Sequence, residues 1–306
     1  MYGLTRWYGR KGAAISALGG LDIAFWDIRG KQAGLPIYRL LGSKKDSVPA
    51  YASGLLWHDD VNDLEEEAVR HRRNGFRRVK MRLGRSEEYD RAALEAVLRA
   101  VPGDEVMVDG SHQYTLESAT RFANFLSSKN IFWFEEPFAP EDIDSFIALR
   151  KKVSVPLAAG ENEFGVQGFR ELLRAGAVDI VQADASRAGG ITECLRIGRM
   201  AANAKARIAP HTWSDAVAVV ANAHVVSSLE NGVTVEVDQT GNPFIDKLLV
   251  KPLEIADGQL RLSQGPGLGI ELNDSVVESL ELPRNARIPD GNYSDMIFGA
   301  DYAQAN

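Results

Sequence analysis

Three features are scarce in this sequence, and each absence argues against a class of protein. The 306 residues include one cysteine, Cys194, which cannot form an internal disulfide and lies in an apolar helical pattern that favours packing. No apolar run approaches the roughly 18 residues of a membrane span, and the N-terminus lacks a secretory pattern. Basic residues are not in excess, because 35 Lys and Arg stand against 42 Asp and Glu. We therefore expect a cytoplasmic protein without nucleic-acid or membrane partners.

Short β-rich runs alternate with helix-forming segments from about residue 50 onwards, which is typical of parallel βα units. The expected helices include 63–74, 87–100, 116–127 and 143–151. The expected strands are Val48–Ser53, Phe76–Leu83, Glu105–Asp109, Ile131–Glu135, Pro156–Glu161, Asp179–Asp184, Arg207–His211 and Val233–Val237. An open doubly wound sheet competes with a closed barrel, but eight successive units of similar length favour closure. A barrel of about 250 residues also fits the chain length. The expected fold class is α/β, a (β/α) barrel of the TIM type.

Seven of these strands carry an ionisable residue at or near their C-terminal end. The residues are Lys80, Asp109, Glu135, Glu161, Asp184, His211 and Glu236. Their spacing of 23 to 29 residues places one in each successive unit. In a closed barrel these strand ends form a single rim, where active sites of this fold are built. The sequence therefore predicts a catalytic rim.

Three carboxylates are expected to converge, because Asp109, Glu135 and Glu161 come from adjacent strands. Three negative charges so close together would repel one another unless a cation neutralised them. All-oxygen ligation suits Mg²⁺, whereas a zinc site would want His or Cys. Strand alternation cannot send both Glu135 and Glu136 inward, so we take Glu135 as the ligand and Glu136 as a supporting or loop residue.

The chain resembles the mandelate racemase and muconate lactonizing enzyme group of the enolase superfamily. The resemblance rests on an ordered set of motifs, which are VKMR, VDGS, WFEEP, GEN, VQAD followed by Gly-Gly, APH, and the terminal runs AISALGGLDIAFWDIRGKQAGLPIYRLLG and GPGLGIEL. It implies Mg²⁺ at the three carboxylates and a hydrogen-bonded pair of Asp184 and His211. It also implies that Lys80 lies across the substrate and that Glu236 lies near the reacting carboxylate. Lys80 and, if protonated, Glu236 would stabilise the charge that develops.

The same resemblance divides the chain into three parts. Residues 1–47 are similar to the last, helical part of an N-terminal α+β capping domain, of which only this remnant is expected here. Residues 48–247 form the barrel, and 248–306 return towards the cap. We expect impaired stability or activity without the rest of the cap, and relatives of this kind suggest a homo-oligomer.

Two departures from the family pattern bear on the reaction. The family motif is often Lys-x-Lys, whereas this chain has Lys80-Met81-Arg82, and Arg82 shares the face of Lys80. An arginine stays protonated and is a poor base, which weakens a two-base racemase and leaves room for one-base chemistry. Ser111 stands where the family often has Asn, and His112 could touch the substrate as a loop residue. Lys80, Arg82, Ser111, His211 and Glu236 are the predicted substrate-binding residues.

We therefore expect an enzyme, a lyase that dehydrates acid sugars. His211 would remove the proton beside a carboxylate and help to expel a β-hydroxyl, giving a 2-keto-3-deoxy acid. The substrate would be a small aldonate or aldarate. Alternatives are a sugar-acid lactone cycloisomerase, a racemase or epimerase of the same superfamily, and a catalytically weakened barrel that only binds a ligand.

Overall fold

The computed structural model describes residues 1–5, 7 and 9–281. The chain divides into two compact units, Met1–Leu272 and Asn273–Asn306. The described part of the second unit contains the short helix α12 (Asp274–Ser279). The expected segment 248–306 therefore lies partly outside the described residues. All other elements belong to the first unit.

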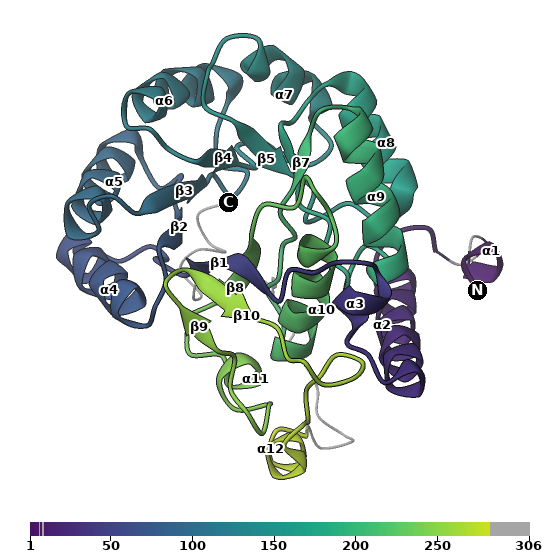
Figure 1. Ribbon diagram of the computed structural model, residues 1–306. Coiled ribbons are helices and arrows are strands. Elements are labelled where there is room, and N and C mark those ends of the chain that lie inside the picture. The colour runs from purple at the N-terminus through teal and green to yellow at the C-terminus, as the bar shows by residue number, and fades with distance from the viewer. Residues whose placement is uncertain (6, 8, 282–306) are drawn as a thin grey trace. The chain divides into compact units, whose positions relative to one another are not determined.

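Eight parallel strands form a closed barrel in the first unit (Figure 1). They are β1 (Ser47–Ser53), β2 (Arg78–Arg82), β3 (Glu105–Asp109), β4 (Trp133–Glu135), β5 (Leu157–Ala159), β6 (Ile180–Val181), β7 (Arg207–Ile208) and β8 (Val235–Asp238). Strands β1 to β7 pair in chain order, and β8 pairs with β1. The ring closes where Ile208 of β7 forms a parallel bridge with Gly232, just before β8. The predicted barrel is confirmed, and the open doubly wound sheet is excluded.

Each barrel strand is followed by a helix, and these helices surround the strands (Figure 1). They are α4 (Val61–Arg73), α5 (Glu87–Ala100), α6 (Leu116–Ser128), α7 (Ile143–Arg150), α8 (Gly165–Ala175), α9 (Ile191–Asn203), α10 (Ala216–Ser227) and α11 (Pro243–Asp246). Side-chain caps begin several of them; Thr115 and Ser118, for example, form a reciprocal capping box at the start of α6. The four helices expected from the sequence match α4 to α7 to within two residues.

Two apolar layers hold the barrel together, one on each face of the sheet. The larger layer lies between the strands and the helices and includes Phe134. The smaller layer fills the inside of the barrel with Tyr51, Met107, Trp133, Ala158, Ile180 and Ala209. Trp133 points inward and the next residue, Phe134, points outward, as strand alternation requires. The interior is thus a packed floor, and the polar side chains of the rim stand above it.

A hairpin that the sequence analysis missed extends the sheet beside β1. Strands β9 (Ile255–Ala256) and β10 (Gln259–Arg261) pair with each other, and β10 pairs antiparallel with β1. The turn residues Asp257 and Gly258 have φ angles of 48° and 74°. Positive φ at both positions is the signature of a tight hairpin turn, and Asp-Gly is one of its preferred sequences. This dipeptide was the signal that could have predicted the hairpin.

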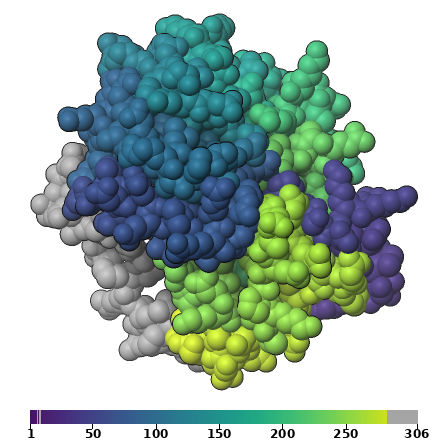
Figure 2. Space-filling model, turned by 60° about the vertical axis from the view of Figure 1, so that its left-hand side comes forward, coloured from purple at the N-terminus to yellow at the C-terminus, as the bar shows by residue number. Residues whose placement is uncertain are grey.

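The N-terminal helices pack against the barrel through close backbone contacts. They are α1 (Tyr2–Thr5), α2 (Ala13–Ala33) and α3 (Ile37–Leu40), and all three lie in the segment 1–47 that was expected to be helical. A Cβ atom at Gly30 would lie only 2.4 Å from the Cα of Gly267, so the two segments need glycine there. Leu268 N donates to Asp27 Oδ1 at 2.8 Å. Figure 2 shows this side-by-side arrangement, in which purple N-terminal atoms border yellow-green ones.

The division into residues 1–47, 48–247 and 248–306 stays a prediction. Within the described residues, no helix is both long and apolar enough to cross a membrane.

Candidate active site

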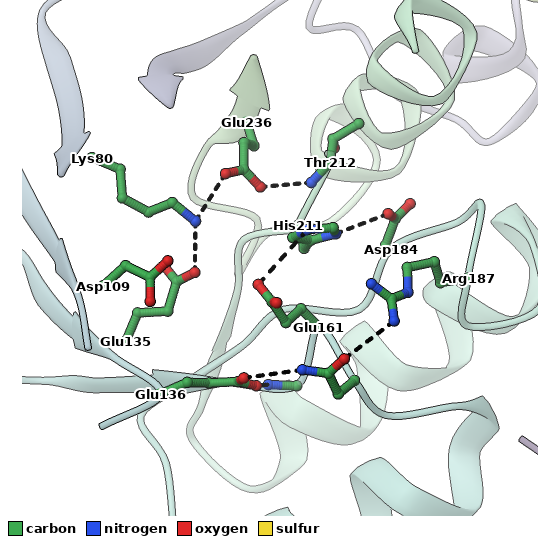
Figure 3. A network of polar contacts seen from close by, with 12 residues as sticks. Lys80, Asp109, Glu135, Glu136, Glu161, Asp184, Arg187, His211, Thr212 and Glu236 are labelled. Carbon is green, nitrogen blue, oxygen red and sulfur yellow. Dashed lines mark hydrogen bonds and ion pairs between the residues drawn. The ribbon is translucent and has the colours of Figure 1, made fainter. Parts of the chain in front are cut away.

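The seven rim residues gather above the barrel floor, on strand ends and on the loops that follow them (Figure 3). Lys80, Asp109, Glu135 and Glu236 lie within their strands. Glu161, Asp184 and His211 were expected in strands, but β5, β6 and β7 end two or three residues before them. These strands are shorter than predicted because the polar side chains leave the ladder to face one another. The register of β3 and β4 sets Asp109 directly beside Glu135.

Lys80 joins two buried carboxylates on one side of the rim. Its Nζ lies 2.6 Å from Glu135 Oε1 and 2.8 Å from Glu236 Oε1. Burial works against the charge of Lys80, but the two glutamates raise its pKa well above the usual value. Burial also opposes ionisation of Glu236, yet Lys80 and His211 lower its pKa to about 2. The charges of Lys80 and His211 thus favour the carboxylate form of Glu236.

One ammonium group cannot neutralise two carboxylates, and the shortage of positive charge favours a proton on Glu135. Burial raises the pKa of Glu135 to about 8; Lys80 opposes this rise, and Asp109, Glu236 and Glu161 add to it. Trp133 Nε1 donates to Glu135 Oε2 at 2.9 Å and fixes the side chain from the barrel floor. Glu135 is thus an acidic group in need of more positive charge.

Arg82 enters the site, as strand alternation predicted. Its Nη2 donates to Asp109 Oδ2 at 3.1 Å, and its guanidinium lies 5.8 Å from the centre of the Trp213 ring. Burial opposes the charge of Arg82, but Asp109 and Glu161 raise its pKa. Ser111 uses its backbone N and Oγ to donate to Asp109 Oδ1, at 2.8 and 3.1 Å. Ser111 therefore orients Asp109 and contributes a hydroxyl beside it.

His211 and Asp184 form the expected hydrogen-bonded pair on the other side of the rim. His211 Nδ1 lies 3.1 Å from Asp184 Oδ2, and Nε2 lies 3.7 Å from Glu161 Oε2. Since Asp184 accepts at Nδ1, the ring directs Nε2 towards the carboxylates (Figure 3). Burial lowers the pKa of His211, but the charge of Glu161 and the hydrogen bond to Asp184 raise it to about 9.

Asn222 is a supporting residue that the sequence analysis missed. It is buried in α10, and its Nδ2 donates to Asp184 Oδ1 at 3.0 Å and to the backbone oxygen of His211 at 3.2 Å. Ala185 N donates to Asn222 Oδ1 at 2.9 Å. One amide thus fixes both members of the pair. A polar residue inside the apolar run VAVVANAHVV was the available signal.

A second group of polar residues adjoins Glu161 and is centred on Glu136. Glu136 and its neighbour Glu135 are both buried. Glu136 has a positive φ of 28°, so its backbone is not extended and the alternation of side chains along β4 does not apply to it. It accepts from His112 Nε2 at 2.6 Å and from Gly160 N at 2.9 Å. The interpretation of Glu136 as a supporting residue agrees with these contacts.

The donor set at the rim fits a divalent cation in the type of its atoms. Asp109, Glu135 and Glu161 supply only oxygen atoms, and burial raises the pKa of Glu161 as well, with further contributions from Glu136 and Asp109. Among the described residues, however, no three His, Cys, Asp or Glu side chains are already gathered in the geometry of a metal site. Two of the three carboxylates point at Lys80 and Arg82 instead. Binding a cation would require them to turn towards one another.

Cys194 and three further histidines have their hydrogen bonds with residues other than the seven of the rim. Cys194 is buried, with its Sγ donating to the backbone oxygen of Ala183 at 3.5 Å, in line with a packing role. His224 is buried beside Tyr38 and Leu268. His58 and His71 both contact Glu67.

Two family models match this chain in order. The model for the mandelate racemase and muconate lactonizing enzyme N-terminal domain matches residues 3–42, and the enolase C-terminal domain-like model matches residues 63–276.

Curated relatives and solved structures agree with these models. D-galactarolactone cycloisomerase of Agrobacterium fabrum is 36% identical, over 92% of this chain and 78% of its own length. Arabinonate dehydratase of Saccharolobus solfataricus is 36% identical, over 91% and 75%. The crystal structure of L-talarate dehydratase from Polaromonas sp. JS666, complexed with Mg and L-glucarate, has a TM-score of 0.81 at 30% identity and covers 89% of this chain and 74% of that one.

These relatives are lyases and isomerases, so the prediction of an enzyme is confirmed. The chain belongs to the mandelate racemase and muconate lactonizing enzyme group of the enolase superfamily.

Proposed function

We propose that this enzyme removes the proton beside the carboxylate of an acid sugar and then eliminates water, giving a 2-keto-3-deoxy acid. The observation that carries the proposal is the asymmetry of the rim. One side offers a histidine paired with an aspartate, and the other offers two cations held by carboxylates. One base and two fixed positive charges suit proton removal from a single face.

The carboxylates of Asp109, Glu135 and Glu161 would hold the metal ion, for which Mg²⁺ is proposed. When bound, it would supply positive charge to the substrate carboxylate as negative charge develops there. The raised pKa values of Glu135 and Glu161 support this assignment, because they show that these buried acids lack positive charge nearby, and so does the relative crystallised with Mg.

His211 acts as the base through Nε2, because Asp184 occupies Nδ1. The ring must be neutral to accept a proton, and a cation held by Glu161 would offset the negative charge that raises the pKa of His211. Nε2 takes the proton from the carbon beside the carboxylate, and the electron pair of that C–H bond moves onto the carboxylate oxygens. Lys80 and Arg82 place their charges across from the imidazole and oppose the cost of the second negative charge.

The elimination of water then needs no further reactant. The electron pair returns to form a double bond to the β-carbon as the β C–O bond breaks. His211 returns its proton to the departing hydroxyl, which leaves as water. The resulting enol converts to the 2-keto-3-deoxy acid.

Racemisation is disfavoured on the same grounds. It needs a proton acceptor on each face of the substrate, and the side opposite His211 carries Lys80 and Arg82. Neighbouring carboxylates raise the pKa of both residues, so neither readily gives up its proton.

A sugar-acid lactone cycloisomerase is the second candidate, because the cycloisomerase relative is as similar to this chain as the arabinonate dehydratase. The same base could remove the proton, and a ring C–O bond would break in place of the bond to a hydroxyl.

The product separates the two functions. The enzyme is incubated with Mg²⁺ and a panel of five- and six-carbon aldonates, aldarates and their lactones. We expect 2-keto-3-deoxy acids from at least one open-chain acid. Turnover of lactones alone would establish the cycloisomerase, and no product from any member would count against both.

A further inference from the structure

The loop after β3 holds a histidine that the proposed chemistry does not use. His112 Nε2 donates to Glu136 Oε2 at 2.6 Å, and the histidine side chain remains 35% exposed. One edge of the ring is therefore fixed, and part of the remaining ring surface is exposed.

The backbone of this loop is held in an unfavourable conformation. Ser111 and His112 have φ angles of 46° and 64°, and neither is glycine. His112 N donates to the backbone oxygen of Glu136 at 2.9 Å, and Tyr114 N donates to that of Pro137 at 3.0 Å. Left-handed non-glycine residues that are held by their surroundings cluster at functional sites. These contacts give the imidazole a defined position.

Glu136 links His112 to the loop that holds Glu161 and, through that loop, to the loop after β6. Asn162 Nδ2 donates to Glu136 Oε2 at 3.3 Å, and Arg187 Nη2 donates to Asn162 Oδ1 at 3.2 Å. These contacts form a polar network that joins the loops after β3, β4, β5 and β6. The network runs alongside Glu161 (Figure 3). It forms a wall of the site away from Lys80 and Glu236.

The contact with Glu136 favours the protonated form of His112. Burial lowers the pKa of His112, but the hydrogen bond and the charge of Glu136 raise it above the usual value, with contributions from Glu161 and Asp109. Arg187 places its guanidinium at the other end of this network of polar contacts, where it donates to Asn162. A histidine fixed at one nitrogen can donate from the other to a carboxylate.

We propose that His112 contacts the end of the acid sugar remote from the reacting carboxylate and selects a second carboxylate there, so that aldarates are preferred to aldonates. Glu136 is the positioning residue that sets the direction of the ring. The inference rests on the proposed function and deepens it by naming the substrate class.

The test is a binding measurement that does not depend on turnover. All proteins carry His211→Asn, which prevents proton removal, and calorimetry with Mg²⁺ gives the affinities for a six-carbon aldarate and for the aldonate of the same hydroxyl configuration. His112→Gln should lower the ratio of these affinities about tenfold or more, since a charged hydrogen bond to the second carboxylate is lost. The aldonate affinity should change much less.

His58→Gln is the matched control. The side chain of His58 is also 35% exposed and also contacts a buried glutamate, Glu67, at 3.0 Å. His58 Nδ1 also lies 3.8 Å from Asp63 Oδ2 on α4, and His58 N donates to Tyr89 Oη on α5 at 3.0 Å. The affinity ratio should be unchanged in this variant.

A second pair of variants keeps the proposal testable if His112→Gln folds poorly. His112→Lys retains a positive charge and should keep most of the aldarate preference, whereas Glu136→Gln releases the ring and should reduce it. An unchanged ratio in His112→Gln, or a parent protein without aldarate preference, would overturn the proposal. Either result would leave the reaction itself to be judged by the product assay.

Discussion

At the residue scale, the site contains buried acidic groups that outnumber the basic groups paired with them. Lys80 lies between Glu135 and Glu236, all three almost fully buried. The desolvation cost of such a group is offset only while every charge keeps its counter-charge.

Replacement of Lys80 by methionine should therefore destabilise the protein strongly. Two buried carboxylates would lose their shared cation, and we expect the free energy of unfolding to fall by about 3–5 kcal/mol. Urea unfolding without added divalent ions measures the change. The double variant Lys80→Met, Glu236→Gln removes one of the two orphaned charges and should recover part of the loss. Equal stabilities of the single and double variants would contradict this account.

His224 should make stability depend on pH, far from the rim. Tyr38 N donates to its Nδ1 at 3.2 Å, and burial lowers the pKa of the ring to about 4. The unfolded chain, with a histidine pKa near 6.5, binds a proton at pH values between about 6.5 and 4, where His224 in the folded protein stays neutral. The contribution of neutral His224 is thus fully present above about pH 6.5 and is lost as the pH falls towards 4, by about 3 kcal/mol in total.

Urea midpoints measured from pH 7.5 to 4 in the parent protein and in His224→Gln test this sign. The stability difference between the two proteins should shrink as the pH falls. A difference that stays constant, or grows, would show that His224 does not titrate in this way.

At the element scale, the sequence predicted most of the scaffold and less of its fine geometry. Alternation and helix-forming composition located all eight barrel strands and the helices α4 to α7, because these patterns depend on local burial. The ends of β5 to β7 were overestimated, since polar residues such as His211 and Asp184 leave the ladder to meet each other. That choice depends on tertiary contacts.

The site was predicted in part for the same reason. Strand spacing placed Asp109, Glu135 and Glu161 on one rim, but the partners of Glu136 could not be predicted from alternation. A positive φ at Glu136 turned its side chain to His112 and Gly160. Asn222 was missed because its partners come from loops distant in sequence.

Two adjacent glycines test how α2 is docked. A Cβ at Gly19 would lie 2.6 Å from the backbone oxygen of Ala185, next to Asp184, whereas a Cβ at Gly20 would meet nothing within 4 Å. Gly19→Ala should destabilise the protein by about 1–3 kcal/mol through overpacking. Gly20→Ala should stabilise it by about 0.5–1 kcal/mol, because alanine favours a helix.

Thermal melting of both variants gives the comparison directly. Equal effects of the two substitutions would mean that α2 does not approach the loop after β6 as closely as described.

At the scale of the whole barrel, the fold brings groups from different βα units to one end of the first unit. The β3, β4 and β5 units supply the acids, β2 supplies the cations, and the loops after β6 and β7 supply Asp184 and His211. The apolar layer of Trp133 and Tyr51 supports them from below. The two proposed reactions, dehydration and lactone opening, differ in the bond that breaks last, but in the proposed mechanism both start with His211 removing the same proton.

The most direct measurement is therefore exchange of that proton with solvent. The protein is incubated in deuterium oxide with Mg²⁺ and an acid sugar that it binds, and NMR follows deuterium at the carbon beside the carboxylate. We predict incorporation by the parent protein and a rate lower by about 10²–10⁴-fold in His211→Asn, which keeps the fold but lacks the base. Binding without exchange in the parent protein, or equal exchange in both proteins, would contradict the account.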